Sequence, residues 1–216
     1  ADSAFIFAIQ GTAVANTHTY VDDTAAGAND GSSWADAFTD LQSALNLASF
    51  GNEIRVAAGA YTPSVEVGGT GVRFRSFQLV NGVAVKGGYP DGGGDETTRA
   101  PQLHTTLLTG DIDGNGVIDT GNAYHVFHHP EGTELDDTAV LDGVIIAAGH
   151  ADGDWPHSIG AGMYNFANSP ALTDCRFTGN VGGGMANESG SHPVLGRCTF
   201  SGNTADYAGG GLYNIQ

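Results

Sequence analysis

The sequence has little positive charge and few cysteines, and both shortages narrow the range of functions. Seven lysine and arginine residues stand against 24 aspartate and glutamate residues, so the formal net charge at pH 7 is −17. Such a field repels phosphate backbones and anionic membrane surfaces, which argues against nucleic-acid binding. Two cysteines are too few for a disulfide framework. No apolar run reaches the roughly 18 residues of a membrane span, so we expect none.

Common catalytic and nucleotide-binding signatures are also missing. The sequence contains no G-x-S-x-G, HExxH, Walker A or dinucleotide fingerprint. Charged residues make up only 14% of the chain, whereas glycine supplies 34 of its 216 residues. That balance disfavours helices and favours many short strands joined by tight turns.

The clearest positive feature is internal repetition near the end of the chain. Residues 170–180 and 193–203 share the pattern Pro-x-Leu-x-x-Cys-x-Phe-x-Gly-Asn at an offset of 23 residues. A period near 23 suits one turn of a three-stranded β-solenoid, with turns about 4.8 Å apart. The sequence therefore predicts an all-β fold, a right-handed parallel β-helix. Six side chains form its predicted core ladder: Leu172, Cys175, Phe177, Leu195, Cys198 and Phe200.

The two cysteines occupy equivalent positions in adjacent turns of this ladder. Cys175 and Cys198 are expected to pack there as small apolar residues, with a disulfide between them as the alternative. A zinc site at this position is disfavoured, because neither a CxxC motif nor paired histidines accompany the cysteines.

An N-terminal cap is expected over residues 17–50. It contains a predicted amphipathic helix at about 33–48, with Ser32 or Ser33 available as N-cap. Five apolar residues recur there at helical spacing: Trp34, Phe38, Leu41, Leu45 and Ala48. Such a helix would shield the first turn of the solenoid from water and from stray strand pairing.

The rest of the chain, residues 51–216, is assigned to the β-helix, and its last residues lie inside a repeat unit. We therefore expect an uncapped C-terminal end. Loop insertions are predicted at about 62–72, 90–104 and 111–122, where glycine and aspartate are dense.

Residues 1–16 contain a short apolar run that is either the remnant of a secretory signal or a mature β-strand. We favour the strand, which would add to the sheet of a neighbouring copy. The residues expected to take part in assembly are Phe5, Ile6, Phe7, Ile9, Leu212, Tyr213 and Ile215.

Several stretches carry a family resemblance. Residues 20–24 and 29–34, with the helix after them, resemble the start of large bacterial surface proteins that have pectate-lyase-like β-helices. The Gly-Gly-Gly-Leu-Tyr-Asn and Cys-x-Phe-x-Gly-Asn repeats are similar to those of polymorphic outer-membrane proteins. The resemblance covers roughly residues 17–216 and implies a secreted or cell-surface protein. It says little about activity, because this fold hosts lyases, hydrolases, adhesins and passive stalks.

The sharpest local motif is a candidate calcium loop. Its acidic and amide residues, with Gly116, match the ligand positions of an EF-hand-type loop, except that Asn122 stands where a bidentate glutamate would close it. Any Ca²⁺ there would be structural, and the alternative is an Asx-rich turn that bonds its own backbone. The candidate ligands are Asp111, Asp113, Asn115 and Asp119.

The histidines invite a metal interpretation, which we do not favour. On a strand, His125 and His129 would share one face and His128 would point to the other. Exposed histidines at strand edges are commoner than metal sites. His157 shows no spacing that supports a site.

Three functions follow. The first is a non-catalytic extracellular scaffold, adhesin or filament subunit that assembles head to tail, or a part of a longer surface protein. The second is a secreted polysaccharide lyase or glycoside hydrolase, and the third a calcium-stabilised carbohydrate-binding module with a glycan ligand.

The resemblance implies that a lyase would use a basic residue beside carboxylates, here drawn from Arg73, Arg75, Lys86, Asp91, Asp95 and Glu96. A hydrolase needs only paired carboxylates, for which Asp136, Asp137, Asp152 and Asp154 are available.

Overall fold

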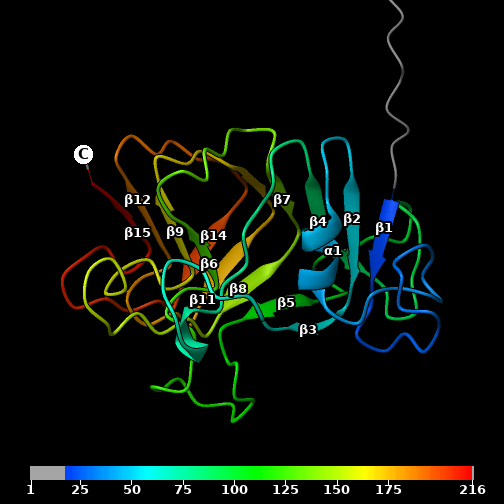
Figure 1. Ribbon diagram of the computed structural model, residues 1–216, viewed down its shortest axis with the longest axis horizontal. Helices are drawn as coiled ribbons and strands as arrows, with labels where there is room; N and C mark the ends of the chain where they lie inside the picture. The colour runs from blue at the N-terminus through cyan, green and yellow to red at the C-terminus, as the bar shows by residue number, and fades with distance from the viewer. Residues whose placement is uncertain (1–17, 216) are drawn as a thin grey trace, which may run out of the picture.

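The computed structural model describes residues 18–215, which form three sheets of short strands (Figure 1). The first sheet contains β1 (His18–Val21), β2 (Glu53–Ala57), β4 (Ala84–Tyr89), β7 (Val140–Asp142), β10 (Ala171–Thr173) and β13 (Val194–Gly196). The second contains β3 (Gly59–Tyr61), β5 (Thr106–Thr109), β8 (Ile145–Ala147), β11 (Arg176–Thr178) and β14 (Thr199–Ser201). The third contains β6 (Phe127–His129), β9 (Met163–Phe166), β12 (Met185–Glu188) and β15 (Leu212–Asn214).

The chain visits the three sheets repeatedly in one order. Strands β4, β5 and β6 belong to the first, second and third sheets, and the same holds for β7–β9, β10–β12 and β13–β15. All pairings between the named strands are parallel. In Figure 1 the strands follow one another along the long axis of the molecule, from blue β1 to red β15. The predicted strand-rich fold with parallel sheets is confirmed.

The repeat offset of 23 residues sets the strand register. Leu172 pairs with Leu195 in the first sheet, and Phe177 pairs with Phe200 in the second. The two phenylalanine rings stack with centroids 4.7 Å apart and planes 10° apart. Because strand side chains alternate between faces, an identical spacing in each turn returns the same side chain to the interior.

The corner between the first and second sheets uses one backbone conformation repeatedly. Gly143, Asp174 and Arg197 each stand between the two strands of their turn, and their φ angles are 72°, 53° and 52°. Left-handed backbone costs a residue with a Cβ roughly 1–2 kcal/mol, so glycine is the cheapest choice. Aspartate and arginine nevertheless hold this corner in the last two turns, where Arg197 pairs with Asp174 at 2.6 Å.

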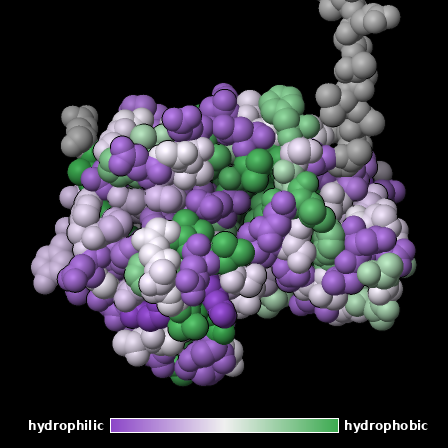
Figure 2. Space-filling view, in the orientation of Figure 1, coloured by the Kyte–Doolittle hydropathy of each residue, from purple (hydrophilic) through white to green (hydrophobic). Residues whose placement is uncertain are grey.

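A continuous apolar core lies between the sheets. It runs along the first sheet in register, from Ile54 in β2 through Val85 in β4 to Leu141 in β7 and Leu172 in β10, and Val56 of β2 belongs to the same core. All five side chains are at most 1% exposed. On the face shown in Figure 2, hydrophobic residues lie in small groups among hydrophilic ones.

The single α-helix in residues 18–215 is shorter than predicted. Helix α1 spans Leu41–Leu47, not about 33–48, and the carboxylate of Asp40 caps it by accepting from Ser43 N at 2.8 Å. The upstream residues make local turns instead: Ser33 Oγ donates to Asp36 at 2.9 Å. Serine and aspartate compete with helix formation in this way. Helix α1 packs against β1 and β2 and adds Leu41 to the core.

The predicted loop insertions fall between strands. Residues 62–71 precede a 3₁₀ turn, η1 (Val72–Phe74), and neither 90–104 nor 111–122 contains a strand.

In the part of the chain from 18 to 215, no helix is long and apolar enough to cross a bilayer. The predicted assembly residues Phe5, Ile6, Phe7 and Ile9 lie outside the described residues.

Candidate functional site

Asparagine side chains form a buried ladder along the third sheet. Asn165 Nδ2 donates to Asn187 Oδ1 at 2.8 Å, and Asn187 Nδ2 donates to Asn214 Oδ1 at 2.9 Å. The three residues pair in register in β9, β12 and β15. Asn165 and Asn187 are buried, so each amide depends on its neighbour for hydrogen bonds.

A second ladder joins the end of β11 to the end of β14. Asn180 Nδ2 donates to Asn203 Oδ1 at 2.9 Å, while Asn180 Oδ1 accepts from Gly149 N at 3.0 Å. Asn203 Nδ2 donates to the Phe177 carbonyl at 3.0 Å. The sequence repeats contain these asparagines, but the pattern alone assigned them no role. The structure identifies them as the polar connection between consecutive turns.

The predicted core ladder comes together, and its last turn is less covered. Leu172, Cys175 and Phe177 are buried; Leu195, Cys198 and Phe200 are half-buried and pack against the core. Both cysteines are free thiols. Burial raises the pKa of the Cys175 thiol, whereas a hydrogen bond with Cys175 lowers the pKa of the Cys198 thiol.

The candidate calcium loop closes on its own backbone. Asp111 accepts from Gly116 N at 2.9 Å, and Asp119 accepts from Gly121 N at 2.7 Å. Asn115 Nδ2 donates to Asp113 at 2.9 Å. These contacts match the Asx-rich turn that the sequence leaves as the alternative, and calcium at this loop stays a prediction.

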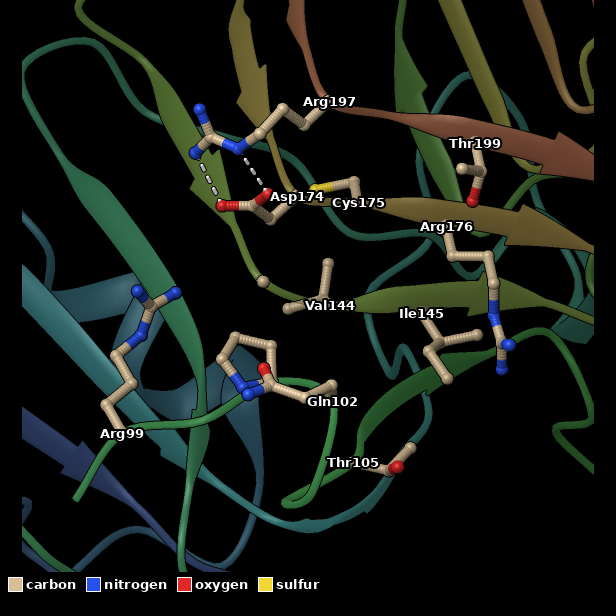
Figure 3. Close-up of a pocket in the computed structure, with 12 residues that line it drawn as sticks. Arg99, Gln102, Thr105, Val144, Ile145, Asp174, Cys175, Arg176, Arg197 and Thr199 are labelled. Atoms are coloured by element: carbon tan, nitrogen blue, oxygen red, sulfur yellow. Dashed lines mark hydrogen bonds and ion pairs between the residues drawn. The ribbon is translucent and has the colours of Figure 1, made fainter.

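A groove of about 480 Å³ crosses the outer face of the second sheet (Figure 3). Three of the chain's few basic residues line it: Arg99, Arg176 and Arg197. Arg197 is paired with Asp174, and Arg99 Nη2 lies 2.9 Å from Asp142. Figure 3 shows Arg176 extending away from the other two. No hydrogen bond or ion pair engages its guanidinium within residues 18–215, so the groove offers one exposed free cation.

The structure divides the residues proposed for lyase chemistry, since it brings Lys86 to Glu96 but pairs Arg73 with an acid outside that set. Arg73 forms an ion pair with Asp152 and donates to the Asn122 carbonyl at 2.8 Å. Lys86 instead lies beside Glu96, with Nζ and Oε1 3.6 Å apart. The arginine and the lysine therefore belong to two different charge clusters.

Three further predicted acids are engaged in hydrogen bonds. Asp95 accepts from Thr97 N at 2.9 Å and Asp136 accepts from Thr138 N at 2.9 Å, which are the turn contacts that isolated loop carboxylates usually make. Asp91 accepts from Thr24 Oγ1 at 2.8 Å, a residue 67 positions earlier in the chain.

Three histidines from two segments of the chain meet beside the third sheet. One ring nitrogen of each of His125, His128 and His157 lies within 4.8 Å of the other two. His128 belongs to β6, His125 precedes that strand, and His157 lies in the 148–162 loop between β8 and β9. His125 Nε2 and His157 Nδ1 are 2.9 Å apart.

This grouping corrects the sequence prediction for the histidines. Strand β6 begins only after His125, so strand alternation does not govern that residue, and its ring centroid lies 4.8 Å from that of His128. His129 Nδ1 contacts Asn165 Oδ1 at 2.7 Å and stands apart from the group. His157, which the spacing had dismissed, is the third member.

Burial keeps the grouped imidazoles neutral. It lowers the pKa of His125 well below its usual range, lowers that of His128 to about 4 and also lowers that of His157. Aromatic rings enclose the group: Phe74 meets His157 edge-on with centroids 4.9 Å apart, and Tyr164 lies 5.4 Å from His128. A neutral imidazole has one nitrogen with a free lone pair.

Comparison with known proteins identifies no relative: no protein-family model, curated protein or solved structure matches this chain.

Proposed function

We propose that this protein is a non-catalytic extracellular scaffold, built as a right-handed parallel β-helix. The repeated visits of the chain to three parallel sheets support this, since each turn lays one strand on each sheet. Parallel crossover connections are right-handed in about 98% of cases, which supports the hand. The low content of basic residues fits a secreted, cell-surface protein that binds no nucleic acid.

The observation that carries the scaffold proposal is the identity of neighbouring turns. Asn165, Asn187 and Asn214 hold one position in three successive strands of the third sheet. Phe177 and Phe200 do the same in the second sheet. Because neighbouring turns carry the same residues at the same positions, a turn that stacks on its neighbour within one chain can stack in the same way on a turn of a second chain. We therefore propose self-association by stacking of turns, in which contact between different surfaces generates open fibres.

Electron microscopy and sedimentation of the full chain test this proposal. Filaments with an axial repeat of one subunit are the expected result. Ile6→Asp tests the predicted N-terminal assembly strand and is expected to abolish filaments. Leu47→Asp is the matched control, because Leu47 is 71% exposed at the end of α1 and tolerates a charge. A monomer at every concentration, or filaments that persist in Ile6→Asp, would contradict self-association through that strand.

The arginine-lined groove favours a second candidate, a protein that binds or cleaves a glycan. Arg176 is unpaired there, and Thr105 and Thr199 add hydroxyl groups to the lining. Incubation with a panel of polysaccharides separates the alternatives. Release of new sugar ends would indicate a lyase or hydrolase. Retention without cleavage, lost in Arg176→Ala, would indicate a carbohydrate-binding module, with or without Ca²⁺ support. If the protein neither cleaves nor retains any polysaccharide, the scaffold proposal stands.

A further inference from the structure

The histidine group beside the third sheet contains one nitrogen without a partner. His128 is 2% exposed, and its Nε2 atom has no hydrogen-bond partner among the described residues. Its other nitrogen, Nδ1, faces the Val67 carbonyl at 3.2 Å. That contact assigns the ring proton to Nδ1, because a carbonyl can only accept. Nε2 therefore holds a lone pair that is buried and directed at no protein donor, which is costly unless something binds it.

The ring of His125 is fixed in the same way. His125 Nδ1 faces the Gly160 carbonyl at 3.0 Å, which places its proton on that side and its lone pair on Nε2. In known metal sites, a ligating histidine commonly donates its second N–H to a backbone carbonyl, which sets both the tautomer and the ring orientation. His125 and His128 both have this arrangement, and one ring nitrogen of each lies within 4.8 Å of the other.

We infer that His125, His128 and His157 form a mononuclear binding site for a divalent transition metal, with Zn²⁺ as the ion that the donor set suits best. Three neutral imidazoles satisfy zinc, which takes nitrogen ligands at about 2.0–2.1 Å. A tetrahedral ion at that distance separates its nitrogen ligands by about 3.3 Å. The 2.9 Å between His125 Nε2 and His157 Nδ1 is within a few tenths of an ångström of that value.

Metal binding replaces one hydrogen bond. With its lone pair on Nε2, His125 accepts the N–H of His157 Nδ1. On binding, that proton passes to His157 Nε2 through solvent, and the lone pair freed on Nδ1 joins the other two at the ion. No proton is lost overall. Because His157 is only half-buried, solvent can reach its ring and carry the proton from Nδ1 to Nε2. The rings of His125 and His128 stay in place during this exchange.

The ion would connect segments that the repeats do not join. His157 lies in the 148–162 loop, His128 lies in β6, and the Val67 carbonyl behind His128 belongs to the 62–71 loop. Gly68 in that loop packs so closely that an added Cβ would stand 2.4 Å from Cε1 of His128. The ligand rings are thus held in place by backbone contacts, aromatic rings and the 62–71 loop before any ion arrives. Three protein ligands would leave the fourth position of a tetrahedral Zn²⁺ open for water or another ligand.

Zn²⁺ titration of the full-length, tag-free chain tests the site, with chelator competition to obtain the affinity. We expect one Zn²⁺ per chain, and X-ray absorption is expected to show three imidazole nitrogens at about 2.0 Å. His157→Ala is the informative variant, because this ligand is half-buried and lies in a loop. It should weaken binding by more than about 100-fold, since the loss of an outer-shell partner alone costs about 10–100-fold.

His192→Ala is the matched control, because His192 is exposed and lies outside the group. It should retain the wild-type affinity. Equal Zn²⁺ affinity in His157→Ala and His192→Ala would overturn the site, and so would a wild-type chain that binds no stoichiometric Zn²⁺. If His157→Ala fails to fold, the X-ray absorption spectrum of the loaded wild type decides. An oxygen-dominated shell would then reject the three-histidine assignment.

Discussion

The side-chain amide of Asn165 donates a hydrogen bond to the side-chain carbonyl of Asn187, its register partner in the next turn, at 2.8 Å. Asn187 repeats this contact with Asn214. Asn187→Leu would remove both bonds and leave the buried Asn165 amide unsatisfied. We expect a loss of about 1–3 kcal/mol in the free energy of unfolding, the usual cost of one orphaned buried group. Chemical denaturation measures it.

Asn214→Ala provides the comparison. Asn214 is exposed and accepts only the last bond of the ladder, so water can take the place of its side chain as the acceptor for Asn187 Nδ2. Its loss should be clearly smaller than that of Asn187→Leu. Equal losses would mean that the ladder contributes through packing and not through hydrogen bonds.

The two thiols of the core ladder should differ in reactivity. Cys175 is buried with a raised pKa, whereas Cys198 is half-buried and its pKa is lowered by the hydrogen bond with Cys175. Since the thiolate is the nucleophile, iodoacetamide at pH 7 should label Cys198 first. Peptide mass spectrometry follows both sites over time. Cys175→Ala should slow the labelling of Cys198, and an unchanged rate in that variant would show that exposure alone controls it.

The repeats allowed the core to be predicted residue by residue, because a constant offset returns each side chain to the same face. Leu172, Phe177 and their partners one turn later lie opposite each other as a result. The cap was predicted less well. Apolar spacing indicated a long helix, but Ser33 and Asp36 hold a local turn that spacing alone does not show.

The histidine group could not be predicted for a different reason. His125 and His157 are 32 residues apart, and His157 lies in a loop that belongs to no repeat. Loop conformation depends on tertiary contacts, here the packing of Phe74 and Tyr124 against the imidazole of His157. The sequence signal was limited to the density of histidines near β6, which did not identify the third member.

Calcium at the 111–122 loop has a direct thermodynamic test. If Asp111, Asp113 and Asp119 hold Ca²⁺ only in the folded state, added Ca²⁺ should raise the unfolding free energy by about 2.7 kcal/mol at 100 times the dissociation constant. Thermal unfolding with Ca²⁺ and with a chelator measures this. Asp113→Asn should remove the effect, and Asp136→Asn, in an exposed turn elsewhere, should preserve it. Identical curves with and without Ca²⁺ would leave the Asx-rich turn as the role of the loop.

The charge cluster on the first sheet should make stability depend on pH. Glu53 is buried, which raises its pKa, but hydrogen bonds and ion pairs from Lys86 and Arg55 outweigh burial and lower it below the usual range. A carboxylate with a lowered folded-state pKa stabilises the fold above its unfolded-state pKa, about 4.3. That stabilisation is lost as the pH falls through the folded-state pKa.

Lys86→Met isolates this contribution, because it keeps an unbranched side chain as far as Cε and removes the charged Nζ that lies 2.6 Å from Glu53. Unfolding free energies of the wild type and the variant, measured from pH 7 to pH 3, should differ most above the unfolded-state pKa of Glu53. The difference should shrink as the carboxylate is protonated. Arg197→Met, in an exposed pair, should cost little at any pH, since surface pairs contribute about 0–1 kcal/mol. A difference for Lys86→Met that stays constant down to pH 3 would assign the stabilisation to the packing of the lysine stem and not to its charge.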